Sequence, residues 1–320
     1  MTTASRIPAD RGLTTRMFLT GLFLVILYAA FGAILWAVFK SFVIMFVVIF
    51  GLLFLQYWFS DKIALWGMRG RIVTPEEAPQ LHGAVDRLCA LADMPKPRVA
   101  IADVDMPNAF ATGRSPKAAV VCATTGILRR LDEPELEAVL AHEISHVAHR
   151  DVAIMTIASS LGVLAGLLTR MMFFATMFGG GGRGGRTQSG GQLVLMEMAV
   201  LLVSIVVYAI SYLLTMALSR YRELAADRSG ALLIGRPSLL AAALVKVTGD
   251  MARIPTRDLR RAEPFNAFFF APAMTTRPGQ QGQGGGGGFS LSQLFSTHPS
   301  LERRLAQLSE LEAQLGQAQH

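Results

Sequence analysis

The chain has 320 residues, of which 52% are hydrophobic and only 17% are charged, and its formal net charge is +7. Soluble domains carry roughly 25% charged residues, so this composition predicts that part of the chain lies in a lipid bilayer. The positive charge does not indicate a nucleic-acid partner, because the arginines lie beside apolar runs and form no basic cluster interleaved with aromatic residues.

Four apolar stretches are long enough to form helices that cross a bilayer, which takes about 20 residues each. Residues 17–39 and 42–59 form a first pair, and residues 152–178 and 193–218 form a second pair. A cleaved secretory signal is the alternative for the first stretch. Its length and the second stretch directly after it favour a membrane anchor.

The second pair carries one charge in each stretch, Arg170 and Glu197. Charges inside a membrane are costly, so we expect these two side chains either to pair with each other or to reach an interface. The Gly-rich loop 179–192 between the two stretches is predicted to be flexible.

Lysine and arginine residues gather on one side of the predicted spans. That side carries Arg6, Arg11, Arg16, Lys62, Arg69, Arg71, Arg150, Arg220, Arg222 and Arg228, and the opposite side carries Lys40, Arg183 and Arg186. By the positive-inside rule, both termini and the segment 62–151 are predicted to be cytoplasmic.

Shorter elements are predicted between the two apolar pairs. Residues 75–93 have the pattern of an amphipathic helix with Pro75 in its first turn. Three short strands are predicted at 97–104, 108–113 and 118–125, separated by Pro- and Gly-containing turns.

A further helix is predicted to begin near Asp132, because Glu135 three residues later completes a capping box. Helices are also predicted at 219–234 and 237–251, and a last amphipathic helix at 299–315.

The helix that begins near Asp132 contains the sequence AHEISHVAHRD, in which His142, Glu143 and His146 form an H-E-x-x-H motif. Histidines four residues apart lie on one helix face and present their imidazoles to one point, where they can bind zinc. Glu143 is placed to take a proton from an activated water molecule. His149 is about 10 Å along the helix from His142, so a third ligand must come from elsewhere. Two surface histidines at a helix end are the alternative.

The segment 219–230 supplies a candidate third ligand. Arg220, Glu223 and Asp227 lie on one helical face there, which by itself is typical of a solvated charged surface. However, H-E-x-x-H precedes the third apolar stretch and Glu223 follows the fourth. If these stretches form a hairpin, both half-sites return to the same membrane surface. We therefore predict His142, His146 and Glu223 as ligands of one zinc ion per chain.

Three segments, AHEISHVAHRD, SRYRELAADRSGA and STHPSLERRL, together resemble the HtpX family of membrane zinc metalloproteases, gluzincin relatives of the CAAX prenyl proteases. The resemblance covers nearly the whole chain and departs from the family mainly in the Gly-rich insertions near 179–191 and 278–288. It implies an endopeptidase of the bacterial inner membrane whose active site faces the cytoplasm and which removes damaged or misassembled membrane proteins as part of quality control and the stress response.

In the mechanism that these residues predict, zinc activates a water molecule and Glu143 acts as general base and then as general acid. Asp227, one turn beyond Glu223, is predicted either to orient a ligand imidazole or to pair with Arg220. His298 is a candidate transition-state donor, with a purely structural role as the alternative.

Two further sets of residues are predicted near the site. Arg303 or Arg304 is expected to pair with Asp227. Residues Asn108, Ala109 and Phe110 are predicted to form an exposed edge strand that holds extended substrate, with an ordinary hairpin strand as the alternative.

The predicted fold is an α+β membrane protein with a mainly helical, zincin-like metalloprotease domain, a small β-sheet and up to four transmembrane helices. Its predicted parts are a cytoplasmic N-terminus (1–16), a transmembrane hairpin (17–59), a first protease segment (60–151), a second apolar hairpin (152–218), a second protease segment (219–277), a Gly-rich linker (278–289) and a C-terminal helix (290–320).

The predicted partners are the lipid bilayer and unfolded or damaged membrane proteins, and the oligomeric state is left open. Two alternatives keep the same metal site: a peptide-processing protease of narrow specificity, and a non-proteolytic scaffold stabilised by zinc. A scaffold has no use for Glu143. A transporter is disfavoured because the sequence has no evident inverted repeat.

Overall fold

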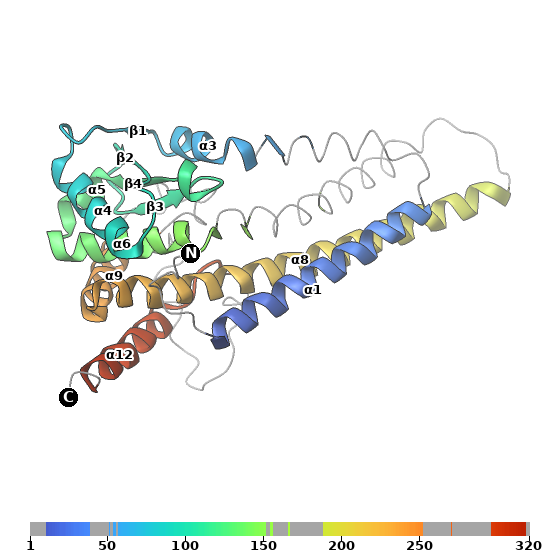
Figure 1. The fold of residues 1–320 in the computed structure, drawn as a ribbon. Coiled ribbons are helices and arrows are strands. Elements are labelled where there is room, and N and C mark those ends of the chain that lie inside the picture. The colour runs from blue at the N-terminus through green and yellow to red at the C-terminus, as the bar shows by residue number, and fades with distance from the viewer. Residues whose placement is uncertain are drawn as a thin grey trace, which may run out of the picture.

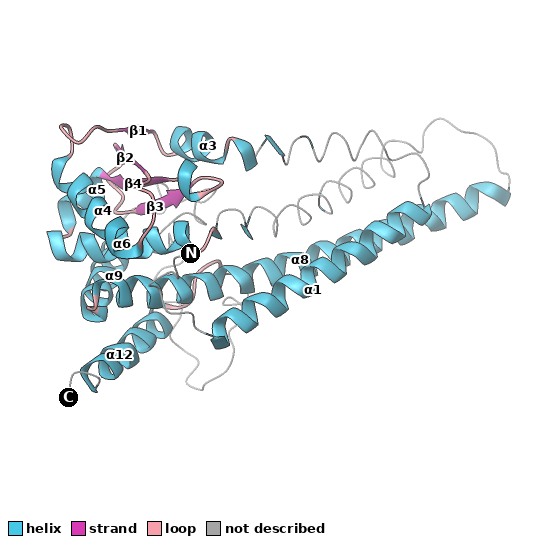
Figure 2. Ribbon diagram, in the orientation of Figure 1, coloured by secondary structure: helices cyan, strands magenta, loops and turns pink. Residues whose placement is uncertain are grey.

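A computed structural model describes residues 11–38, 51, 54–55, 57–151, 154–155, 166, 188–251, 270 and 296–317. Two long helices, α1 (Arg11–Val38) and α8 (Gln188–Ile234), lie side by side and extend away from a smaller unit of helices and strands (Figure 1). The described part is mostly helical, with one small sheet (Figure 2). This agrees with the predicted mainly helical protein with a small sheet.

The sheet contains β1 (Gly70–Ile72), β2 (Arg98–Ala102), β3 (Ala109–Thr112) and β4 (Val120–Thr124), in the order β1-β2-β4-β3. β2 and β4 are parallel, whereas β1 and β3 are each antiparallel to their neighbours. The three predicted strands are confirmed. β1 was not predicted, because three residues are too few to establish an alternating pattern.

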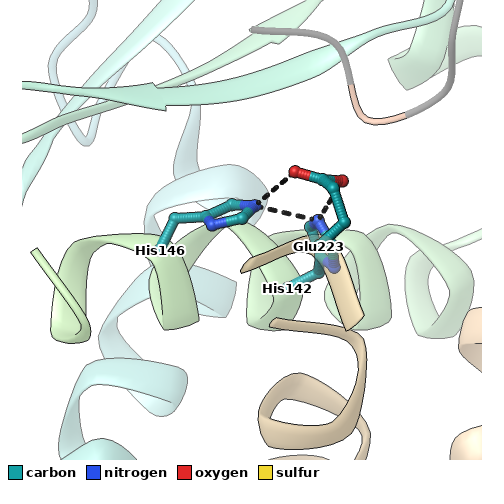
Figure 3. A group of neighbouring side chains, drawn as sticks. All are labelled: His142, His146 and Glu223. Atoms are coloured by element: carbon teal, nitrogen blue, oxygen red, sulfur yellow. Dashed lines mark hydrogen bonds and ion pairs between the residues drawn. The ribbon is translucent and has the colours of Figure 1, made fainter. Parts of the chain in front are cut away.

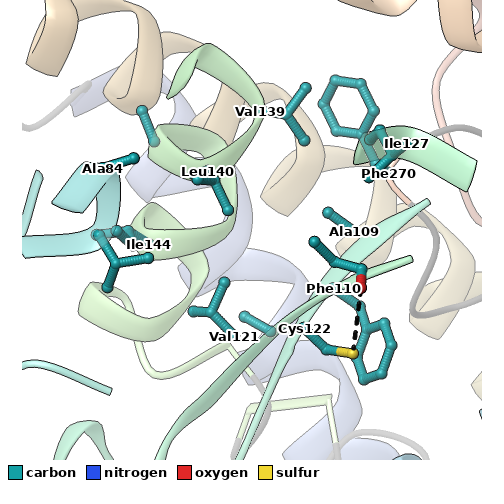
Figure 4. Packing of buried hydrophobic residues seen from close by; sticks show 14 of the residues in the cluster. Ala84, Ala109, Phe110, Val121, Cys122, Ile127, Val139, Leu140, Ile144 and Phe270 are labelled. Atoms are coloured by element: carbon teal, nitrogen blue, oxygen red, sulfur yellow. Dashed lines mark hydrogen bonds between the residues drawn. The ribbon is translucent and has the colours of Figure 1, made fainter. Parts of the chain in front are cut away.

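Helix α6 (Glu133–Ala148) carries the H-E-x-x-H motif, and the predicted capping box is confirmed. Asp132 accepts a hydrogen bond from the Glu135 backbone amide, and Glu135 accepts one from the Asp132 amide. Leu140 and Ile144 of α6 pack in the same buried cluster as strand β4 (Figure 4). The cap sets where the helix begins, and the packing sets which face it turns to the sheet.

The remaining elements are short helices around the sheet and at the C-terminus: α3 (Ser60–Gly67), α4 (Pro79–Ala92), the 3₁₀ turn η1 (Pro116–Ala118), α5 (Thr125–Arg130), α9 (Pro237–Met251) and α12 (Leu301–Gln317). The helix predicted at 237–251 is confirmed: it begins at Pro237 and continues to Met251, where this described stretch ends.

The prediction that a helix begins at Pro75 is wrong, because α4 begins at Pro79. Residues before it form a turn, in which the Glu77 carboxylate accepts hydrogen bonds from the Thr74 amide and the Arg71 guanidinium. These bonds hold the backbone in a turn where the apolar pattern alone suggested a helix.

Two described helices are long and apolar enough to cross a membrane, with candidate spans at Thr14–Phe31 and Leu201–Ile234. They overlap the first predicted span over residues 17–31 and the fourth over residues 201–218. Most of the second and third predicted spans lies outside the described residues, as does Arg170, so its pairing with Glu197 stays a prediction. The fourth span and the helix predicted at 219–234 form the single helix α8.

Candidate active site

Three potential metal ligands lie close together: His142 and His146 of α6 and Glu223 of α8 (Figure 3). The Nε2 atoms of His142 and His146 are 3.2 Å apart. The carboxylate oxygens of Glu223 lie 3.7 Å from Nε2 of His142 and 3.4 Å from Nε2 of His146. All three residues are buried. The structure thus places the three predicted ligands around one point.

These distances fit a zinc ion. Ligands about 2.0–2.1 Å from a tetrahedral zinc are roughly 3.3 Å from one another, which is close to the separations observed between the three side chains. Two imidazoles and one carboxylate also form the donor set of many catalytic zinc sites, in which a fourth position stays open. The residues present therefore fit the predicted cofactor.

The ligands from two helices meet because α6 and α8 approach each other closely at Gly230. A Cβ atom at this position would lie 2.7 Å from the backbone nitrogen of His142, which is shorter than any ordinary contact. Glycine therefore allows the approach. Glu223 lies two turns before Gly230 on the same helix, so the contact fixes its position beside the histidines.

Asp227 lies between a ligand histidine and an arginine. Its carboxylate is 2.9 Å from Nδ1 of His142 and accepts two hydrogen bonds of 2.6 Å from the Arg304 guanidinium. The alternative partner, Arg220, instead donates to the Ser296 carbonyl. A carboxylate on Nδ1 turns Nε2 of the histidine toward the metal position, which is the arrangement expected for a residue that orients a ligand.

Arg304, and not Arg303, lies in this cluster. Arg304 is 1% exposed and also donates to the Phe270 carbonyl. Arg303 is exposed on α12. Adjacent helical residues point about 100° apart, so only one of the two can face Asp227. Of the two candidates that the sequence offered, Arg303 is wrong as a site residue, and the structure places Arg304 there.

Asp151 is a site residue that the sequence analysis missed. Its carboxylate lies 2.6 Å from Nδ1 of His146 and 3.1 Å from Nε of Arg222. Burial alone would raise the pKa of Asp151, but Arg222 and His146 outweigh this effect and lower the pKa to about 2. Each ligand histidine is thus held by a carboxylate, which is in turn paired with an arginine.

Glu143 lies beside the ligands and is 3% exposed. Burial raises the pKa of Glu143 to about 8, although the nearby His146 and the Ala111 backbone amide act in the opposite direction. A carboxylate whose pKa is near neutrality can both accept and return a proton, as a general base and acid must. A metal ion held by the neighbouring ligands would favour the ionised form of Glu143.

The other two histidines near the motif differ in position. His298 is buried, and its Nδ1 atom lies 3.2 Å from the Glu223 carboxylate, so the structure brings this candidate into the site. His149 instead lies at the end of α6, where its Nε2 atom is 3.5 Å from the Ser229 hydroxyl.

The predicted substrate strand is β3, which lies at the edge of the sheet formed by the described strands. The prediction that these residues are exposed is wrong, because Asn108, Ala109 and Phe110 are all buried. The Asn108 side chain accepts a hydrogen bond from the Phe270 amide. The contact to Glu143 is made by the amide of Ala111, one residue beyond the predicted segment. Strand β3 therefore faces the candidate catalytic carboxylate.

A helix with two ligand histidines and a buried glutamate, a third ligand from a second helix and an adjacent edge strand define a metalloprotease of the zincin type. Residues 75–312 match the family described as Peptidase family M48. The chain belongs to this family.

Known relatives agree with this assignment. The chain is 57% identical to "Protease HtpX homolog 1" of Streptomyces coelicolor, with 98% of this chain and 97% of the relative covered. It is 52% identical to "Protease HtpX homolog" of Moorella thermoacetica, with 96% and 97% covered. The resemblance to HtpX and the metalloprotease activity predicted from the sequence are confirmed.

A solved structure, the crystal structure of S. mikatae Ste24p, has a similar fold. The TM-score is 0.53 at 19% identity, and the match covers 92% of this chain and 67% of that chain. At this identity the similarity concerns the arrangement of the elements only.

Proposed function

We propose that the protein is a zinc-dependent endopeptidase of the inner cell membrane whose active site faces the cytoplasm and which degrades damaged or misassembled membrane proteins. The observation that carries this proposal is the position of Glu143. It is buried beside three ligand side chains, on a helix that packs against strand β3. A zinc site that only stabilised the fold would have no use for a fourth buried carboxyl group, because removing such a polar group from water is costly.

His142, His146 and Glu223 would hold the zinc ion. When bound, zinc would polarise the scissile carbonyl and make the attacking water more acidic. Glu143 accepts the proton of that water as the new carbon–oxygen bond forms, and then delivers it to the leaving amine nitrogen as the carbon–nitrogen bond breaks. Asp227 and Asp151 keep the two imidazoles oriented throughout.

Strand β3 supports a broad substrate range. An extended segment that pairs with an edge strand is held mainly by backbone hydrogen bonds, which depend little on sequence. The edge of β3 lies next to Glu143, so a segment bound there would pass the catalytic carboxylate. Unfolded proteins expose such segments, and folded ones do not. This favours quality control over the processing of one specific peptide.

Orientation in the membrane is supported by charge. The positive residues that flank the predicted spans gather on the side that carries both termini and α6. The ends of α6 and α8 that form the site lie together in the α/β unit (Figure 1). A cytoplasmic site follows if the positive-inside rule holds for this chain.

Cleavage of casein by the purified full-length protein in detergent, with zinc restored after chelation, tests the function. Glu143→Gln is expected to keep about one zinc per chain and to lose roughly 10²–10⁴-fold in cleavage rate. Glu137→Gln is the matched control, because Glu137 is on the same helix and pairs with Arg87 away from the site.

The outcomes separate the alternatives. If both variants and the unchanged protein retain zinc but none of the three cleaves casein, a zinc-stabilised scaffold is favoured. Cleavage of a prenylated peptide but not of unfolded membrane proteins would favour a processing protease. Glu143→Gln cleaving as fast as the unchanged protein would remove Glu143 from the mechanism.

A further inference from the structure

A cationic pocket of about 330 Å³ lies outside the metal site, between α3, the start of β2 and the loop after β3. Four basic side chains line it: Lys62, Arg98, Arg114 and Lys117. Asp61 is the one acid among the described residues of its wall, so the pocket has a net charge of about +3 by simple count.

The positive charge of this pocket is only partly compensated. Asp61 pairs with Arg98 at 2.6 Å. In the part of the chain that the structure describes, no carboxylate pairs with Lys62, Arg114 or Lys117. Clustered like charges repel one another, so such an arrangement is destabilising unless an anion binds there.

Aromatic side chains form the rim of the same pocket. The Arg114 guanidinium stacks on the Trp58 ring at 4.1 Å, and Lys62 lies 5.3 Å from the centre of the Phe59 ring. Trp58 is 45% exposed and Phe59 is 38% exposed. Exposed aromatic residues beside lysine and arginine are typical of the membrane–water interface.

The position of the pocket along the chain agrees with this location. Trp58 and Phe59 end the second apolar stretch, and α3 follows directly. On α3, Ile63 is 48% exposed and Trp66 is 86% exposed. Helix α3 lies on the side of the sheet from which α1 and α8 extend away (Figure 1). An apolar face that is exposed in water would be buried at a bilayer surface.

We propose that this pocket binds the phosphate-bearing headgroup of an anionic phospholipid. Arg114, Lys62 and Lys117 would contact the phosphate oxygens, while Trp58, Phe59 and the exposed face of α3 lie among the upper acyl chains. A free phosphate ion has the same charge chemistry, but it would leave the aromatic rim and the apolar face of α3 without a partner. The lipid accounts for both halves of the surface.

Quenching of Trp58 fluorescence provides a direct test, using the full-length protein in nanodiscs. Trp36→Phe and Trp66→Phe leave Trp58 as the single tryptophan of the chain. We compare the quenching of Trp58 by a minor fraction of phosphatidylglycerol with brominated chains with the quenching by the same fraction of brominated phosphatidylcholine. We expect a preference for phosphatidylglycerol on the order of a hundredfold, about fivefold for each uncompensated cation.

Two double variants locate the effect. Lys62→Gln with Lys117→Gln should lower the preference to about fivefold. Arg71→Gln with Lys96→Gln removes the same net charge from exposed side chains outside the pocket and should leave the preference unchanged. Zinc content and melting temperature show whether each variant is folded.

Three results would overturn the proposal. The first is equal quenching by the two brominated lipids. The second is an equal loss of the preference for phosphatidylglycerol in both double variants. The third is loss of this preference in millimolar inorganic phosphate. The first would leave the pocket without a lipid ligand, and the second would ascribe the preference to net charge alone. The third would assign the pocket to free phosphate.

Discussion

The carboxylate of Asp151 lies 2.6 Å from Nδ1 of His146 and 3.1 Å from Nε of Arg222, which immediately precedes Glu223 on α8. One side chain thus connects the helix that carries two ligands to the helix that carries the third. A carboxylate on Nδ1 fixes the ring orientation and directs Nε2 toward the metal. Asp151 is therefore expected to position both halves of the site.

Replacing Asp151 with asparagine tests this role. The change removes the charge but preserves the shape, so we expect zinc affinity to fall about 10–100-fold. Competition against a chromophoric chelator measures the affinity without reference to cleavage. Asp86→Asn is a suitable control, because Asp86 pairs with Lys96 at an exposed position. Unchanged zinc affinity in Asp151→Asn would show that the packing around His146 suffices to hold its ring.

Replacing either of the two neighbouring arginines of α12 should have very different effects on the stability of the protein. Arg304→Gln leaves the buried Asp227 carboxylate without its charged partner, which is expected to cost about 3–5 kcal/mol. Arg303→Gln changes an exposed side chain and should alter stability by less than about 0.5 kcal/mol. Melting temperatures of the two variants in the same detergent compare them directly. Similar melting temperatures would contradict the arrangement described.

A double variant separates this pair from general damage to the core. When Asp227→Asn is added to Arg304→Gln, the buried charge that lost its partner is also removed. The double variant should therefore be less destabilised than the sum of the two single changes. A simple sum would mean that the two side chains contribute independently.

Most of the site could be predicted from local sequence patterns. The spacing of His142 and His146 fixes their common face on any helix, and the capping box at Asp132 gives the start of that helix. Glu223 required an argument from topology, because about 80 residues separate it from the histidines and only the return of the chain to one membrane surface brings them together.

Other features could not be read from the sequence. Asp151 lies five residues after His146 and just beyond the end of α6, where helical periodicity no longer gives its direction. The choice between Arg303 and Arg304 depends on how α12 is rotated against α8, which is a tertiary contact. The continuity of α8 was missed because the change from apolar to charged residues at 218–219 resembles a boundary, although no glycine or proline interrupts the helix there.

Gly230 makes the approach of α6 and α8 possible, so Gly230→Ala should disturb the metal site through the backbone of His142. The added methyl group would lie 2.7 Å from the His142 backbone nitrogen, and the helices must separate to admit it. Overpacking of this kind typically costs about 1–3 kcal/mol. We expect a lower melting temperature together with weaker zinc binding.

Gly249→Ala is the matched control for this substitution. Gly249 is in helix α9 and a Cβ atom there would meet nothing within 4 Å. Alanine favours the helix over glycine by roughly 1 kcal/mol, so this variant should be slightly stabilised. A stabilised Gly230→Ala variant with normal zinc affinity would show that the two helices can separate at no cost.

Zinc binding should release a proton, because His146 holds one in the protein without metal. Burial alone would lower the pKa of His146, but the hydrogen bonds to Asp151 and Glu223 outweigh this effect and raise the pKa to about 10. Burial lowers the pKa of His142, which is therefore neutral. Zinc binds only neutral imidazole, so at neutral pH it must displace the proton of His146.

The sign of the pH dependence follows from this competition. Raising the pH makes each proton easier to displace, so zinc affinity should increase about tenfold per pH unit for each proton released. Calorimetry in buffers of different ionisation enthalpy measures the released protons. We expect up to about two per zinc at neutral pH, one from His146 and most of one from Glu143, whose pKa of about 8 a bound cation would lower. In Asp151→Asn the pKa of His146 loses one of the interactions that raise it, so fewer protons should be released and the affinity should depend less steeply on pH. An undiminished proton release in this variant would mean that Glu223, and not Asp151, holds the proton on His146.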